Sequence, residues 1–193
     1  MTASDAELRK LGLRLSKVKV ELDAVLDRVD RLTEPELPVV SPHGFAFGAR
    51  SLRELVGGGP TPLHPSLRAV AHLALCYSEV DFGCTSGYRT LAKQQQFMDA
   101  GTSWVRRPED SLHTSGHAID LVPWVDGQYT WEDVGAFEQV AFAVWSAARE
   151  LVVGYQLDHG YVLWEKDRPH WQLTSRPGFA DTTPAVTAYL ERL

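Results

Sequence analysis

The sequence SLHTSGHAID, residues 111–120, places an imidazole, that of His113, and a carboxylate, that of Asp120, seven residues apart. Gly116 marks a tight turn between them, and the largely apolar run 118–124 surrounds and follows the carboxylate. A loop that leads into a strand in this way can present two ligands to one metal ion. We therefore expect the fold to be organised around this stretch.

The composition is that of one globular domain with some additional length. The chain has 193 residues, of which 44% are hydrophobic and 23% charged. A net charge of -6, with no basic cluster beyond the pair Arg106-Arg107, argues against nucleic acid as a partner. Charges interrupt every long apolar segment, so we expect neither a signal peptide nor a membrane span, and synthesis in the cytoplasm.

The N-terminal part, residues 1–34, carries a heptad pattern. Its apolar residues alternate in steps of three and four, at Leu8, Leu11, Leu15, Val18, Leu22, Val25, Val29 and Leu32. This pattern predicts an amphipathic, coiled-coil-like helix that oligomerises or docks on a partner through residues 8–32. The alternative is a single amphipathic helix that lies on its own domain. Residues 35–49, with three prolines and two glycines, are expected to be a linker, and residues 50–193 the main domain.

Hydrophobic spacing and turn residues predict the elements of the main domain. Helices are expected over 51–55, 65–76, 91–100, 131–153 and 183–193, and strands over 79–85, 118–124, 128–130, 160–164 and 170–173. Asp126-Gly127 fits a hairpin turn, and Gly154 a helix C-cap. Cys76 and Cys84 are too few for a disulfide framework and have apolar neighbours, so we expect buried free thiols.

A second fragment, KDRPHWQL at residues 166–173, supplies a third candidate ligand, His170. Hydrolytic zinc sites use three protein ligands and leave a fourth position to water, and His113, Asp120 and His170 match this donor set. If Asp120 points toward the metal, strand alternation turns His117 and Ile119 away, which excludes His117. Without the second fragment, a hydrogen-bonded pair of His113 and Asp120 would be the simpler explanation.

Two further residues fit catalytic roles. Asp167 can lie near the metal without binding it, where it would take a proton from the attacking water and deliver it to the leaving amine. The alternative is a solvated turn carboxylate between Lys166 and Arg168. Arg89, at a predicted strand-to-helix turn, could polarise a carbonyl, hold an oxyanion or bind a substrate carboxylate. Its alternative is an exposed surface arginine.

Three ordered motifs resemble a known family. They are Gly87-Tyr88-Arg89-Thr90 with Gln94, Ser111-x-His113-x-x-Gly116-x-Ala118-x-Asp120, and Asp167-x-Pro169-His170-Trp171. Together they look like the zinc D-Ala-D-Ala carboxypeptidases and the related phage L-Ala-D-Glu endopeptidases, over about Phe47 to Leu173. The resemblance implies a small α+β domain, with an antiparallel sheet and helices around one zinc ion. It assigns the ion to His113, Asp120 and His170, the general base to Asp167, an electrophilic or carboxylate-holding role to Arg89, and the lining of the substrate site to Ser111 and Gln94.

The resemblance also sets the functional expectation, which is cleavage of an amide bond in the peptidoglycan stem peptide. Aspartate at position 167, where carboxypeptidases commonly have glutamate, favours an L-Ala-D-Glu endopeptidase over the alternative, a D-Ala-D-Ala carboxypeptidase. The stretch Leu157-Asp158-His159-Gly160-Tyr161 departs from the Trp-Gly-Gly-Asp-Trp-like segment of many phage members, which leaves the roles of Asp158 and His159 open.

The absence of targeting signals and the heptad helix fit a phage lytic enzyme that is released by a holin or carried on a virion or injection apparatus. A hypothesis from a different class is a structural or wall-binding component of a phage tail that uses the helix for assembly.

Overall fold

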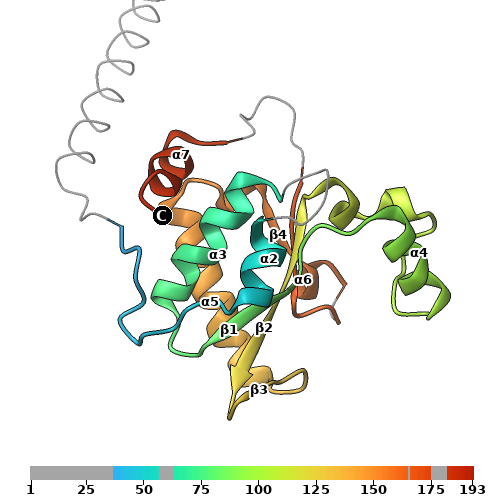
Figure 1. Cartoon of the computed structure of the whole chain (residues 1–193), viewed down its shortest axis with the longest axis horizontal. Helices are drawn as coiled ribbons and strands as arrows, with labels where there is room; N and C mark the ends of the chain where they lie inside the picture. Colours follow the sequence, from blue (N-terminus) through green and yellow to red (C-terminus); the bar gives the residue numbers. More distant parts are fainter. Residues whose placement is uncertain (1–36, 57–62, 165, 175–181) are drawn as a thin grey trace, which may run out of the picture. The chain divides into compact units, whose positions relative to one another are not determined.

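The computed structural model describes residues 37–56, 63–164, 166–174 and 182–193, and Pro38–Leu193 form one compact unit (Figure 1). The predicted heptad helix therefore lies outside the described residues. Part of the predicted linker packs on the domain. The ring of Phe47 meets that of Phe82 edge-on at a centroid distance of 5.7 Å, and the Tyr189 hydroxyl donates to the Pro38 carbonyl at 2.9 Å. The boundaries at residues 34 and 49 stay a prediction.

The centre of the domain is a small antiparallel sheet. Its strands β1 (Phe82–Ser86), β2 (Ala118–Val125), β5 (His170–Leu173) and β4 (Leu157–His159) lie in the order β1-β2-β5-β4. The short β3 (Gln128–Tyr129) pairs with the end of β2 across the predicted hairpin turn, where Asp126 and Gly127 have φ values of 51° and 79°. The predicted α+β fold with an antiparallel sheet is confirmed.

Helices accompany this sheet in the described residues. They are α2 (Ala49–Val56), α3 (Pro65–Tyr77), α4 (Leu91–Asp99), α5 (Val134–Glu150), α6 (Gly160–Trp164) and α7 (Pro184–Leu190). α3 packs against α5 and α7, α5 contacts β2, and α2 lies against β1. Figure 1 shows α3, α5 and α7 grouped together, while α4 lies apart from them. Cys76 and Cys84 are buried free thiols, as predicted.

Two local predictions were wrong, namely a strand over 160–164 and the bounds of the helix predicted over 131–153 with Gly154 as its C-cap. The segment 160–164 is the short helix α6, and the strand that pairs with β5 is instead β4. A short apolar run does not distinguish strand from helix by its period, and here part of the run faces water, with Val162 71% exposed. α5 begins at Val134 because the Asp133 side chain caps the Ala136 amide at 3.0 Å, and it ends at Glu150, before Gly154.

Gly160, the first residue of α6, lies in close contact with the backbone corner that carries Asp167 and His170. A Cβ atom at position 160 would lie 2.6 Å from the Asp167 carbonyl oxygen and 2.9 Å from the His170 Cβ. We therefore expect Gly160→Ala to lower the free energy of unfolding by about 1–3 kcal/mol, because the corner must shift to admit the methyl group. It should also lower kcat, since both neighbours belong to the candidate site.

Thermal unfolding of the variant and steady-state kinetics check this expectation. Gly48→Ala is the matched control, because a Cβ at Gly48 has no neighbour within 4 Å. Equal melting temperatures for the Gly160 variant, the Gly48 variant and the unchanged protein would contradict the close approach.

In the part of the chain that the structure describes, no helix combines the length and the apolar character needed to cross a membrane.

Candidate metal centre and its pocket

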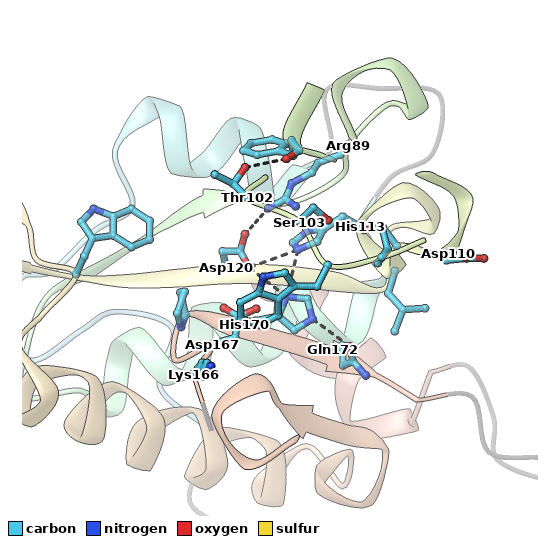
Figure 2. A pocket seen from close by; sticks show the side chains of 17 residues that line it. Arg89, Thr102, Ser103, Asp110, His113, Asp120, Lys166, Asp167, His170 and Gln172 are labelled. Carbon is cyan, nitrogen blue, oxygen red and sulfur yellow. Dashed lines mark hydrogen bonds and ion pairs between the residues drawn. The ribbon is translucent and has the colours of Figure 1, made fainter. Parts of the chain in front are cut away.

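Strand register brings the three predicted metal ligands together. Asp120 on β2 lies directly opposite His170 on β5, and facing residues of antiparallel strands point to the same side of the sheet. His113 comes from the 3-10 turn Leu112–Ser115, which Gly116 ends with a φ of 73° just before β2. The Asp120 Oδ1 atom lies 3.4 Å from His113 Nε2 and 3.2 Å from His170 Nδ1, and the two nitrogens are 3.2 Å apart (Figure 2). The group could hold a metal ion.

Hydrogen bonds behind the two imidazoles determine which nitrogen can bind a metal. His113 Nδ1 lies 2.8 Å from the Gly87 carbonyl, which can only accept, so Nδ1 carries a proton and Nε2 is the nitrogen that a neutral ring would offer to a metal. His170 Nε2 lies 3.0 Å from the Gln172 Oε1 atom, and with a proton on Nε2 the neutral ring would offer Nδ1 in the same way. These two nitrogens are those that face Asp120. Such partners typically orient histidine ligands.

The two carboxylate oxygens of Asp120 face different partners, the imidazoles on one side and an arginine on the other. While its Oδ1 atom faces the histidines, its Oδ2 atom accepts from Arg89 Nη2 at 2.5 Å. Burial raises the pKa of the Asp120 carboxyl, but the nearby His113, and then His170 and Arg89, outweigh this effect and hold the pKa well below its usual value. Asp120 is therefore an anion at neutral pH, as a metal ligand must be.

Arg89 is held in place by a set of contacts of its own. Its Nε donates to the Ser86 hydroxyl at 2.7 Å, and its Nη1 to Gln94 Oε1 at 3.4 Å. The guanidinium also lies over the Phe97 ring, 4.6 Å from its centroid. Because Ser86 is opposite Asp120 across a bulge between β1 and β2, the sheet itself sets the approach of Arg89.

A pocket of about 620 Å³ opens over this group. Arg89, Ser111 and Asp167 line it together with the three candidate ligands. Figure 2 shows Asp167 beside His170, with Arg89 on the opposite side of Asp120. Gln94 is fully buried instead, and its amide donates to the Ser103 hydroxyl at 2.7 Å while its carbonyl holds Arg89.

Asp167 has the properties of a proton acceptor. Partial burial raises its pKa above the ordinary value for an aspartate, against the opposing influence of His170. A carboxylate with a raised pKa holds a proton more readily once it has taken one, which suits general acid–base work.

The remaining polar residues of the predicted motifs lie elsewhere. The His117 ring packs against that of His64, with centroids 5.2 Å apart. His159 faces Trp171 across β4 and β5, on the other side of β5 from His170, and stacks on it at 4.0 Å with an interplanar angle of 7°. Asp158 accepts from the Thr174 hydroxyl at 2.6 Å. These contacts give His117, Asp158 and His159 roles in packing and hydrogen bonding within the fold.

Gln172 and Ser86 also support the site, although neither was predicted from the sequence. For Gln172 a signal was present, because residues two apart on a strand share a face, and Gln172 follows His170 by two. For Ser86 the signal was absent, since its place beside Asp120 depends on a bulge between Cys84 and Ser86.

Comparison with known proteins identifies the family. The model of the phage L-alanyl-D-glutamate peptidases matches residues 43–181, so the chain belongs to this family and is a peptidase. The L-alanyl-D-glutamate peptidase of Escherichia phage T5 is 37% identical over 107 residues, which are 55% of this chain and 74% of that protein. The crystal structure of the Serratia marcescens L-Ala D-Glu endopeptidase ChiX shares 38% identity with a TM-score of 0.56, covering 69% of this chain and 93% of that one. The predicted resemblance is confirmed.

Proposed function

We propose that the chain is a zinc endopeptidase that hydrolyses the amide bond between L-Ala and D-Glu in the peptidoglycan stem peptide. One observation carries the proposal, namely that His113, Asp120 and His170 meet at a pocket that Asp167 also lines. Membership of the phage L-alanyl-D-glutamate peptidase family supports this choice of bond.

The donor set fits one zinc ion. Two neutral imidazoles and one carboxylate are ligand types that zinc takes in hydrolases with three protein ligands. His113 Nε2, His170 Nδ1 and Asp120 Oδ1 would hold the ion, and Arg89 occupies the second oxygen of Asp120. When bound, zinc supplies Lewis acidity, which polarises a coordinated oxygen.

The protein's own residues would then carry the proton and stabilise charge. Asp167 would accept a proton from the attacking water and pass it to the amine of D-Glu as the amide bond breaks. Arg89 lines the pocket next to Asp120, so its positive charge would stabilise the negative charge that develops on the scissile carbonyl oxygen. Ser111, which is buried at the pocket wall, would contact the substrate, and Gln94 would keep Arg89 in place.

Digestion of purified peptidoglycan by the full zinc-loaded chain tests the proposal, with the products analysed by mass spectrometry. The expected result is release of peptides that begin at D-Glu, with L-Ala left on the glycan. Loss of only a terminal D-Ala would identify a carboxypeptidase instead. No released peptide, with one zinc bound per chain, would favour a structural or wall-binding role.

The biological setting completes the proposal. Action on the cell wall requires a route out of the cytoplasm, which we propose to be holin release or delivery on a virion or injection apparatus. The segment 8–32 stays a predicted oligomerisation or docking helix, and the division into residues 1–34, 35–49 and 50–193 stays the proposed domain organisation.

A further inference from the structure

Two largely exposed tryptophans line the pocket beside the candidate metal centre. Trp104 is 67% exposed and Trp131 is 58% exposed, and both belong to the pocket wall. Other tryptophans of the domain have ring partners in the fold, such as Trp145 against Trp171 and Trp124 against Tyr129. Large aromatic surface left open to water inside a substrate pocket is typical of a ligand-binding platform.

Residues next to both tryptophans make side-chain contacts with the fold. Trp104 follows Ser103, whose hydroxyl accepts from Gln94, and Gln94 in turn holds Arg89. Trp131 follows the β2–β3 hairpin and comes two residues before Asp133, whose side chain caps α5. These neighbouring contacts limit the backbone freedom near the two indoles, which lowers the entropy lost when a ligand covers them.

The chemistry of the substrate indicates what would cover these indoles. This step rests on the proposed function, in which the scissile bond joins L-Ala to D-Glu. Near that bond the peptide offers a methyl group and carboxylates, which are poor partners for an indole face. The L-Ala amine, however, is acylated by the lactyl group of muramic acid, so a pyranose ring with an extended C–H face lies one residue from the scissile bond. Aromatic faces bind such C–H surfaces through dispersion and through the ring quadrupole.

We infer that Trp104 and Trp131 form a subsite for the N-acetylmuramyl sugar that carries the stem peptide. The enzyme would then recognise the glycan-linked peptide in preference to the free peptide. The subsite adds binding on the L-Ala side of the scissile bond, while the metal centre and Asp167 act at the bond itself.

Two substrates that differ in the sugar but not in the charge at L-Ala test the inference. One is a purified disaccharide–tripeptide muropeptide, and the other, called the free tripeptide, has no sugar but keeps its L-Ala amine acylated by a lactyl group. We expect Trp104→Ala and Trp131→Ala each to lower kcat/KM for the muropeptide roughly five- to tenfold, mainly through KM, and to change kcat/KM for the free tripeptide less than about twofold. Trp104→Phe and Trp131→Phe should keep most of the activity, since a phenyl ring retains an aromatic face.

Phe142→Ala is the control, because Phe142 is 75% exposed on α5 and should affect neither substrate. Melting temperatures confirm that all variants are folded. An equal loss on both substrates, or no loss on either, would overturn the glycan subsite while leaving the endopeptidase in place. Cleavage of the muropeptide alone by the unchanged protein would support it. Cleavage of neither substrate at the L-Ala–D-Glu bond would overturn the proposed function and the subsite with it.

Discussion

Asp167→Asn is expected to abolish nearly all peptidase activity while zinc stays bound. Asparagine has almost the same shape but cannot accept the proton of the attacking water, so kcat should fall by about 10²–10⁴. Because Asp167 is not one of the three residues that meet as a metal-binding group, zinc content should be unchanged. Muropeptide hydrolysis and elemental analysis of the same sample measure both quantities.

The pH profile of the unchanged enzyme provides a second test of Asp167. A general base must be ionised, and burial raises the pKa of Asp167 above the ordinary aspartate value. Activity should therefore fall as the pH drops through that raised pKa, and this acidic limb should disappear from the residual activity of Asp167→Asn.

Asp126→Asn is the matched control for this variant. Asp126 lies at the hairpin turn with a φ of 51°, a conformation that asparagine tolerates equally well. It should keep full activity. If Asp167→Asn also retained activity, or lost its zinc, Asp167 would not be the base.

His113→Ala is expected to lose both zinc and activity. Removing one of three ligands leaves Asp120 and His170 alone to hold the ion, and the loss of several kcal/mol of transition-state stabilisation corresponds to about a thousandfold in rate. Chelator competition and muropeptide hydrolysis measure the two effects. Retention of one tightly bound zinc with full activity would show that the ligand set is wrong.

Gln172→Leu should weaken zinc binding as His113→Ala does, but to a smaller extent. Without the amide oxygen, His170 Nε2 loses its partner and Nδ1 is no longer kept as the lone-pair nitrogen, so zinc affinity should fall by about 10–100-fold. Gln95→Leu is the comparison, since Gln95 is exposed on α4 and its amide donates to Asp99. Equal zinc affinity for the Gln172 and Gln95 variants would contradict an orienting role for Gln172.

Much of the fold could be predicted from the sequence where a local signal was strong. The apolar run 118–124 and Asp126-Gly127 predicted β2 with its hairpin, and the helices predicted over 65–76 and 91–100 correspond to α3 and α4. The prediction of a strand over 160–164 was wrong because the apolar run has no clear period. In addition, Gly160 lies in close contact with the distant corner at Asp167 and His170, which no local pattern reveals.

Some features of the candidate site could also be predicted from the sequence, while others could not. Donor types predicted His113, Asp120 and His170 as one group, and the structure brings these three residues together. Strand parity predicted that His117 lies outside the group, and its ring packs against His64. The sequence could not show that Arg89 binds Asp120, or that Gln94 supports Arg89 from a buried position. Both contacts depend on how β1, α4 and β2 come together in three dimensions.

The alternation along β5 has a consequence for how the protein tolerates length changes. His170 and Gln172 face the site, while Trp171 between them stacks on His159 and meets Trp145 on the opposite side. A slip of one residue in the pairing of β5 with β2 would turn the indole into the pocket and the imidazole away from Asp120. Insertion or deletion of a single residue within β5 should therefore abolish activity, even where every side chain that remains is acceptable by itself.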